Sequence, residues 1–520
     1  ATVKVRIALF TLPCDGQGNL SFPRLLSHKM ISPPTLYHHL VCYLPLQSLS
    51  PNFKFCSQWN YSHNSLSKLS RRHTLPSFSI SQIHTYDNAI DYETRPILTW
   101  RDVCKKMCAS ETGTVALLKQ LESDGKKLTR WEISKLIKEL RKYKRFRRAL
   151  EVFEWMNSVD KRSQLSPSDA AIQLDLISKV RGITAAEGFF HNIPEASKDG
   201  RVYGSMLNCY AQSKLVENAE SLLETMRSKG YATQSLTFNV IMTLYMNLKQ
   251  FENVEKTIAE MKQNGIRLDI YSYNIWLSSR GSNGTSEDME RVFELMTKDK
   301  SIVPNWSTYT TLATMYVKLG EMEKAEDCLR KTESRLTGRE RLPYHYLLTL
   351  YGNCRNKEGV YRVWKMYKGR FGNITNMGYH TVISALIRIG DLEGAEVKYR
   401  EWVLTNPICD TRLPNLLIGC YAKHGEMDKA EGILKQIEEL GGRPTAYTWE
   451  FLAGGYVLVG KSREALVCLE NCFSSDESNG WKLKRELFDD FVVLCEKEAE
   501  FGRKDTLLDL CTKAGDLHYE

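Results

Sequence analysis

A period of 35 residues runs through most of the chain and constrains its fold more than any other feature. Aromatic residues mark the same place in successive units, 35 or 36 residues apart, and we call these places anchors: Tyr203, Phe238, Tyr273, Tyr309, Tyr344 and Tyr379, followed by Pro414 and Trp449. Tyrosine recurs seven residues after the anchors, glycine eleven residues after them and alanine sixteen residues after them. Because four columns share one period, the chain consists of repeated units rather than unrelated domains. Weaker units are anchored at Ile133 and Ala170, and a partial one begins near Trp481.

Each unit has the pattern of two helices. In the unit that starts at Tyr309, the apolar residues Leu312 and Tyr316 follow at helical spacing. Gly320 then marks the end of the first helix, since glycine readily adopts left-handed backbone there. A single pair of helices cannot bury its apolar face, so neighbouring pairs must stack. The sequence therefore predicts an all-α fold, a right-handed α-solenoid superhelix of about ten 35-residue helix-turn-helix repeats.

Several segments resemble the pentatricopeptide repeat (PPR) family. They are IYSYNIWLSSRG at 270–281, NWSTYTTLATMYVKLGEMEKAE at 305–326 and MRSKG at 226–230. The resemblance covers roughly residues 130–480 and is to the P-class of plant organellar proteins. Residues 168–183 resemble a short-array subgroup predicted to enter chloroplasts or mitochondria. The resemblance to the family implies that single-stranded RNA lies along the first helices. It also implies that the protein has a role in the stability, processing, splicing or translation of organellar transcripts.

The amino-terminal segment differs in composition from the repeats. Residues 16–86 contain no Asp or Glu but 13 Ser and six Lys/Arg. Organelle presequences avoid acidic residues, so we expect a transit peptide or disordered presequence over 1–86. Its abundant serine favours the chloroplast, with the mitochondrion as the alternative, and a Ser-rich tail without a targeting role is the other interpretation. A helical leader over 87–129, the PPR solenoid over 130–480 and C-terminal capping helices over 481–520 complete the expected organisation.

No catalytic or cofactor-binding pattern stands out. The chain has neither a phosphate-binding GxxxxGK[ST] nor an HExxH zinc motif. His424-Gly425-Glu426 matches the first half of a deaminase zinc motif, but Cys468 and Cys472 are four residues apart instead of three. We therefore expect no enzyme, no metal and no cofactor, and no small-molecule substrate. No apolar run is long enough to span a bilayer, so we expect no membrane partner either.

The excess positive charge of the chain is concentrated in one segment. Residues 126–148 hold 11 Lys/Arg and two Glu, which leaves 60 basic and 60 acidic residues in the remainder of the chain. Such a surface gains free energy on RNA by counterion release. The candidates for phosphate contact here are Lys142, Lys144, Arg145, Arg147 and Arg148. A solvated helix face, or a surface that meets an acidic protein, is the alternative.

The resemblance also implies which residues read bases. In that family one base is read by the residue after the anchor together with the last residue of the repeat. Two consecutive pairs fit the pattern, Asn239 with Asp269 (uracil-type) and Asn274 with Asn305 (pyrimidine-type). Leu236 and Tyr271, two residues before their anchors, are candidates for stacking between bases, as is Tyr447. Lys318, Arg388 and Lys423 share one column nine residues after the anchor and are further candidates for phosphate contact.

The remaining repeats depart from the base-reading pattern. Their pairs are Gly204 with Gln234, Thr310 with Glu340, His345 with Thr375, His380 with Asp410 and Asn415 with Thr445. Glu450, at the same position of the next repeat, is expected to place a carboxylate toward the RNA. Two bases cannot specify a transcript. Either the flanking repeats read RNA by shape and stacking, or the chain is a structural scaffold associated with an organellar ribosome or another ribonucleoprotein.

Overall fold

The computed structural model describes residue 103 and residues 113–123, 129–159, 166–337, 340–406, 409–475 and 481–514. The expected presequence and most of the helical leader lie outside these residues. Within them the secondary structure consists of 23 α-helices and one short 3-10 helix, with no strand. None of these helices is long and apolar enough to cross a bilayer.

The helices follow one another in pairs after an initial helix, α2 (Thr114–Ser123). The first pairs are α3 (Arg130–Lys142) and α4 (Phe146–Val159), α5 (Pro167–Arg181) and α6 (Ile183–Asn192), α7 (Gly200–Gln212) and α8 (Val216–Ser228), α9 (Ser235–Asn247) and α10 (Phe251–Gln263), and α11 (Ile270–Asn283) and α12 (Ser286–Lys298). The next are α13 (Trp306–Leu319) and α14 (Met322–Glu333), α15 (Leu342–Asn353) and α16 (Lys357–Arg370), and α17 (Asn376–Ile389) and α18 (Leu392–Thr405). The last are α19 (Arg412–Lys423) and α20 (Met427–Glu439), α21 (Ala446–Leu458) and α22 (Ser462–Ser474), and α23 (Arg485–Lys497) and α24 (Phe501–Ala514). The short 3-10 helix, Glu195–Ser197, precedes α7.

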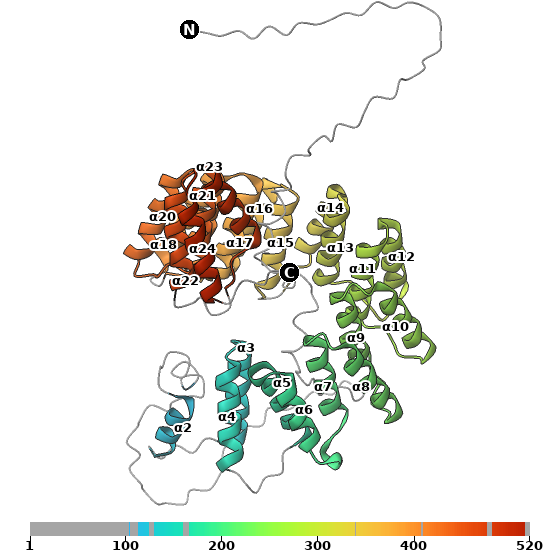
Figure 1. Ribbon diagram of the computed structural model, residues 1–520. Helices are drawn as coiled ribbons and strands as arrows, with labels where there is room; N and C mark the ends of the chain where they lie inside the picture. Colours follow the sequence, from blue (N-terminus) through green and yellow to red (C-terminus); the bar gives the residue numbers. More distant parts are fainter. Residues whose placement is uncertain are drawn as a thin grey trace, which may run out of the picture. The chain divides into compact units, whose positions relative to one another are not determined.

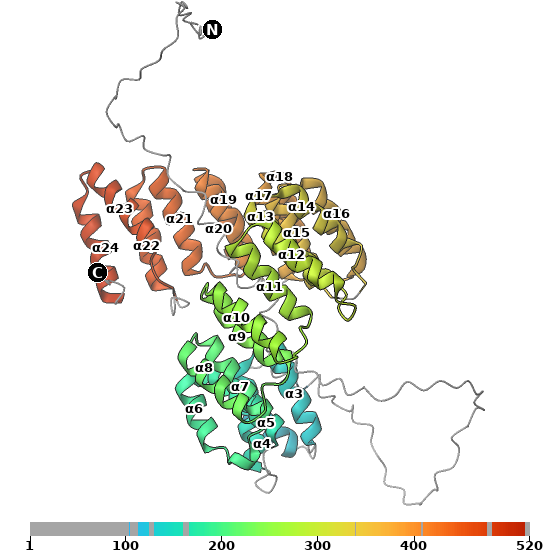
Figure 2. The same cartoon turned by 90° about the vertical axis from the view of Figure 1, so that its right-hand side faces the viewer.

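Consecutive pairs stack on one another, as Figures 1 and 2 show. The two helices of each pair pack together, and from α5 to α23 every first helix also packs against the first helix of the next pair. At the amino-terminal end, α4 makes the packing contact with α5. The predicted all-α solenoid of helix-turn-helix repeats is thus confirmed, and the described residues contain eleven helical pairs.

The repeat columns form the core. The alanine column of the second helices is completely buried, in agreement with the close approach of the two helices that a small side chain permits: Ala219, Ala325, Ala395, Ala430 and Ala465. The anchors are buried as well, apart from the half-buried Trp449. A core built in this way needs only neighbouring repeats to close it, which is why the period in the sequence predicts the fold so directly.

The turn between first and second helix has the same backbone in eight repeats. The residue eleven positions after the anchor, called here the turn position, has positive φ whether or not it is glycine. The glycines are Gly320, Gly390, Gly425 and Gly460, with φ of 82°, 92°, 73° and 73°, and the others are Lys144, Lys214, Lys249 and Arg355, with φ of 58°, 59°, 59° and 55°. The backbone N–H of the residue after the turn position donates a hydrogen bond to the carbonyl five residues earlier, as from Gln250 to Tyr245 at 2.8 Å. This bond satisfies a carbonyl at the end of the first helix.

Hydrogen bonds of the tyrosine column connect consecutive repeats. The Tyr245 hydroxyl donates to Glu220 on the preceding second helix at 2.6 Å, and Tyr316 donates to Glu290 at 2.9 Å. The same bond joins Tyr351 to Glu333, Tyr421 to Glu396 and Tyr456 to Glu431. In α11 the indole of Trp276 replaces it and donates to Glu255 at 2.8 Å. Burial and these carboxylates raise the pKa of Tyr245 and Tyr316. We call this set the Tyr–Glu ladder.

Candidate nucleic-acid interface

The first predicted base-reading pair forms a hydrogen-bonded unit between α9 and α11. The amide Nδ2 of Asn239 donates to both carboxylate oxygens of Asp269, at 3.0 and 3.2 Å. Its Oδ1 accepts a bond of 2.7 Å from the Ser272 hydroxyl. Asp269 is held in place because it also caps α11 through the Ser272 N–H, at 2.8 Å, and accepts from Ser235, at 2.8 Å. The carboxylate therefore fixes which way the Asn239 amide points.

Burial limits access to this pair. Asn239 is only 2% exposed, while Asp269 is half-buried at the start of α11. A base that contacts the amide of Asn239 must therefore displace the side chains that cover it, or separate α9 from α11. The sequence predicts the pairing of Asn239 with Asp269 but does not predict that Asn239 is buried.

The second pair is arranged differently. The amide Nδ2 of Asn274 donates to the Ser307 hydroxyl at 3.1 Å, and Ser307 in turn donates to Asn305 Oδ1 at 2.7 Å. Asn305 is exposed and caps α13 through the Ser307 N–H at 2.9 Å. Asn274 is completely buried, and its Oδ1 has no hydrogen-bond partner in the described part of the chain. The two asparagines are thus linked through Ser307.

The stacking candidates differ in exposure. Leu236 and Tyr271 are half-buried at the starts of α9 and α11. Tyr271 is partly desolvated and lies near Asp269, and both effects raise its pKa. Tyr447, on α21, is 39% exposed. A flat side chain at the surface of a first helix has the geometry for base stacking, and Tyr447 meets this condition best of the three.

The base-reading position of the other repeats holds residues that serve packing. Thr310 is 1% exposed and donates to the Ser307 carbonyl at 3.0 Å, and Asn415 accepts from Thr448 at 2.9 Å. His380 is half-buried, and desolvation together with the nearby Arg412 lowers its pKa to about 4, so the imidazole is neutral at physiological pH. Its Nδ1 has no hydrogen-bond partner among the described residues.

Glu450 does not point toward a ligand, contrary to the expectation from its place in the repeat. It is 4% exposed, accepts a hydrogen bond from the Trp481 indole at 2.9 Å and forms an ion pair of 2.5 Å with the Lys484 ammonium group. Both partners lie in the segment that leads into α23. The carboxylate therefore attaches the last helical pair to α21, because a buried charge needs such partners.

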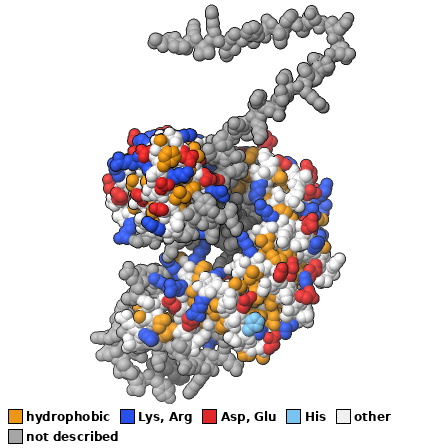
Figure 3. Space-filling view, in the orientation of Figure 1, with side chains coloured by type: hydrophobic (Ala, Val, Ile, Leu, Met, Phe, Trp, Pro, Cys, Tyr) orange, Lys and Arg blue, Asp and Glu red, His pale blue; other side chains and the backbone are white. Residues whose placement is uncertain are grey.

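The predicted phosphate contacts of the amino-terminal repeat lie at the turn between α3 and α4. Lys142, Lys144, Arg145 and Arg147 are exposed, and Arg148 is half-buried. Lys142 is 3.9 Å from Glu139 and Arg147 is 3.9 Å from Glu151, so their ion pairs are long. Figure 3 shows Lys and Arg side chains gathered near the upper end of α3. The turn is an exposed cationic surface.

The other phosphate candidates occupy the last turn of first helices. Desolvation lowers the pKa of Lys318 and of Lys423. Burial also lowers the pKa of Arg388, whose Nη1 donates to Asn353 Oδ1 at 2.7 Å. Lys318 and Lys423 make no ion pair within the described part of the chain.

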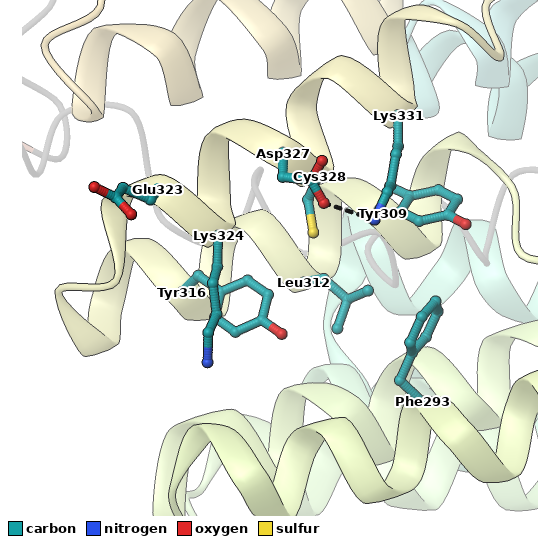
Figure 4. Close-up of a pocket in the computed structure, with 9 residues that line it drawn as sticks. All are labelled: Phe293, Tyr309, Leu312, Tyr316, Glu323, Lys324, Asp327, Cys328 and Lys331. Carbon is teal, nitrogen blue, oxygen red and sulfur yellow. Dashed lines mark ion pairs between the residues drawn. The ribbon is translucent and has the colours of Figure 1, made fainter.

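A cavity lies between α12, α13 and α14 (Figure 4). Its volume is about 400 Å³, and Phe293, Tyr309 and Tyr316 contribute rings to its wall. Its two lysines are paired, Lys331 with Asp327 at 2.6 Å and Lys324 with Glu290 at 2.9 Å. We assign no ligand to it.

The cysteines and the histidine of the sequence's partial zinc motif lie apart from any candidate metal cluster in the described part of the chain. Cys468 and Cys472 are buried in α22, and burial raises the pKa of Cys468 to about 12, so the thiol stays protonated. His424 lies at the turn after α19 and bonds to the Cys420 carbonyl at 2.8 Å. Across the described residues, no group of three His, Cys, Asp or Glu side chains could hold a metal ion.

Comparison with known proteins places these repeats in a family. The PPR repeat family model matches residues 233–282, and the PPR repeat model matches residues 201–231, 307–335 and 414–442. A pentatricopeptide repeat-containing protein of Arabidopsis thaliana is 52% identical over 456 residues, which cover 87% of each chain. The chain belongs to the pentatricopeptide repeat family. The P-class assignment within it stays a prediction.

Other PPR relatives are more distant. A mitochondrial pentatricopeptide repeat-containing protein of A. thaliana is 32% identical over 82% of this PPR chain and 87% of its own. The large ribosomal subunit protein mL101 (rPPR4) of A. thaliana is 33% identical over 77% of this chain and 81% of its own. The crystal structure of PPR10 in complex with an 18-nt psaJ RNA element covers 80% of this chain and 71% of its own, with 17% identity and a TM-score of 0.36.

Proposed function

We propose that this PPR protein binds single-stranded RNA along its first helices and acts in post-transcriptional gene expression of an organelle. Transcript stability, processing, splicing and translation are the outcomes open to it. The observation that carries the proposal is the bond from Asn239 to Asp269. With one N–H fixed on the carboxylate, the amide keeps a second N–H and a lone pair on Oδ1, which suit the adjacent acceptor and donor of a uracil edge.

The exposed cations of the α3–α4 turn support the same proposal. They supply a sequence-independent attraction for phosphates, whereas base contacts supply the selection. No catalysis, cofactor, membrane or small-molecule substrate is part of the proposed function.

A second candidate is a non-catalytic component of an organellar ribosome or another ribonucleoprotein. One relative is named as a large ribosomal subunit protein. The burial of Asn239, Asn274 and Thr310 also favours it, because residues that hold neighbouring helices together need no base to bond with. In this case the α3–α4 turn would contact folded RNA or an acidic protein surface.

The replacement of Asn239 by Thr separates the two candidates. By the pattern of the family, Thr with Asp prefers guanine, so the base selected from random RNA at one position should change from uracil to guanine. One good base contact is worth about 1–3 kcal/mol, or roughly five- to a hundredfold in affinity. Asn253→Thr, on the second helix of the same repeat, is the control and should leave the selected sequence unchanged.

The scaffold candidate makes the opposite prediction. The parent protein would select no sequence, and it would co-sediment with ribosomal particles after mild RNase treatment. This result would refute base reading by Asn239.

The compartment follows from a different part of the chain. Some relatives carry a mitochondrial designation, and the Ser-rich, acid-free residues 16–86 favour the chloroplast. We propose the chloroplast as the destination. A fluorescent protein fused to residues 1–95 should accumulate there. Accumulation in mitochondria would refute the choice of organelle, and a cytosolic signal would refute import itself.

A further inference from the structure

Six repeats carry one cation each at the carboxyl end of the first helix, at one of two alternative positions. In α13, α17 and α19 the cation lies nine residues after the anchor and glycine occupies the turn position: Lys318 with Gly320, Arg388 with Gly390 and Lys423 with Gly425. In α7, α9 and α15 the residue at position nine is neutral and the turn position is cationic: Gln212 with Lys214, Asn247 with Lys249 and Asn353 with Arg355. Each of these six repeats therefore has its cation either at position nine or at the turn position, and not at both.

A cation at the turn position has a conformational cost that a cation at position nine does not have. Lys214, Lys249 and Arg355 have φ of 59°, 59° and 55°, the left-handed region that glycine adopts without strain. Four other repeats have glycine with positive φ at the turn position, so nothing in the turn itself requires a basic side chain. Non-glycine residues persist in such a conformation where something else requires them, and ligand contact is one such requirement.

The environment of these three cations leaves them available to a ligand. All three are exposed, and none forms an ion pair with another residue in the described ranges. A cation near the carboxyl end of a helix also interacts favourably with the helix dipole. Position nine provides that interaction without backbone strain, so the dipole does not explain a cation at the turn position.

The stacking of the repeats brings the six cations to one edge. First helices from α5 to α23 pack side by side, and hydrogen bonds between consecutive first helices join residues 33 to 35 positions apart, as from Asn274 to Ser307 and from Arg388 to Asn353. Their carboxyl ends therefore follow one another along the stack. At the amino-terminal end, Lys142 ends α3 and Lys144 follows it, whereas Lys179 and Arg181, in the last turn of α5, form ion pairs with Asp175 and Glu154. The series is interrupted at α11 and α21, where neither position is cationic. A series of one charge per repeat fits a ligand that has one negative charge per unit, as a single RNA strand has in its phosphates.

We propose that Lys214, Lys249 and Arg355 bind backbone phosphates of single-stranded RNA. In their repeats they take the role that Lys318, Arg388 and Lys423 have in the others, so that six repeats each bind one phosphate. The inference rests on the proposed function, since it names the residues that hold the RNA backbone. It assigns them no part in base selection.

The first test replaces the three residues by glycine in the full-length chain. The variant Lys214→Gly, Lys249→Gly, Arg355→Gly should be more resistant to unfolding, because the strain is removed, and yet bind RNA more weakly. We expect a roughly tenfold loss of affinity for a homopolymeric U strand and for random RNA alike. The slope of log affinity against log salt should decrease by about 2, since each phosphate contact in a single strand contributes about 0.7.

The second test moves the charge instead of removing it. The variant Gln212→Lys, Lys214→Gly, Asn247→Lys, Lys249→Gly gives α7 and α9 the arrangement that α13 has. It should recover the affinity and the salt slope lost by Lys214→Gly, Lys249→Gly while it keeps the gain in stability. Asn353 is left unchanged because it binds Arg388.

The results separate this inference from the proposed function. If the parent protein binds neither RNA, the proposed function fails and the inference with it. If the parent binds RNA and the triple glycine variant has the same affinity and salt slope, only the inference is overturned. Loss of ribosome co-sedimentation with unchanged RNA affinity overturns it too, because the cations then serve a protein surface. A relocated variant that regains no affinity refutes the exchange between the two positions.

Discussion

Glu450 allows a direct decision between a base-reading and a structural role for the residue that follows an anchor. The carboxylate is 4% exposed and bonded to Trp481 and Lys484. We expect substitutions here to change stability around α21–α23 and to leave the RNA preference unchanged.

The magnitude follows from the partners. The removal of one member of a buried ion pair costs about 3–5 kcal/mol, because a charge then remains buried and uncompensated. The Lys484 side chain is 37% exposed, so screening by solvent reduces the expected cost of Lys484→Met to about 2–3 kcal/mol. Glu450→Gln should cost only about 1–2 kcal/mol, since the amide oxygen can still accept from the Trp481 indole. The double variant Glu450→Gln, Lys484→Met should be destabilised by less than the sum of the two single variants, and the difference should be about 1–2 kcal/mol.

The assay must resolve local stability, because repeat arrays need not unfold in one step. Hydrogen exchange of the amides in α21, α22 and α23 gives the local opening free energy. Selection from random RNA with Glu450→Gln gives the base preference. A cost of Lys484→Met below about 0.5 kcal/mol, or a shift in the preferred base with Glu450→Gln, would refute this account.

Two further predictions concern charge. Because desolvation lowers the pKa of His380 to about 4, the stability that its neutral form provides is complete above pH 6.5 and is lost as pH falls toward 4, by up to about 3 kcal/mol. His380→Gln should flatten the unfolding free energy over that range in urea titrations, and an unchanged pH dependence would contradict the assignment. Replacement of Lys142, Lys144, Arg145, Arg147 and Arg148 by Gln should weaken binding of all RNA sequences similarly and reduce its salt dependence, without loss of helicity by circular dichroism. An unchanged affinity and salt slope would instead indicate a solvated face or a protein-docking surface.

The period made the fold predictable in detail. Columns such as Ala325 and Tyr316 recur because each repeat meets the same neighbours, so local pattern and tertiary contact carry the same information. The left-handed backbone was predictable only at the glycines. Lys249 has a positive φ as Gly320 does, but its residue type does not predict this, since the geometry is imposed by the turn between two packed helices.

The candidate site was only partly predictable. The order of Asn239 and Asp269 anticipates their hydrogen bond, because a fixed spacing in two stacked helices brings the side chains together. The burial of Asn239 and the Ser307 bridge between Asn274 and Asn305 depend on how closely two first helices approach, and a single sequence does not encode that distance in any one residue. Glu450 was misplaced for the same reason: its partner Lys484 lies in an irregular segment outside the periodic columns.

The Tyr–Glu ladder has a consequence for how such a protein changes over evolutionary time. A repeat in the interior of the ladder, such as α13–α14 or α19–α20, supplies a glutamate to the repeat after it and a tyrosine to the glutamate before it. The two junctions of such a repeat are therefore alike. Loss of one whole unit, for example residues 410–444, would join Glu396 to Tyr456, and its duplication would join Glu431 to a second copy of Tyr421, so the junction is preserved in both cases. Excision across α17 is different, because Leu386 occupies the tyrosine column there and supplies no hydroxyl. The array can therefore lengthen or shorten by whole units at the junctions that carry the bond, and a change in the number of repeats requires no new interface to arise.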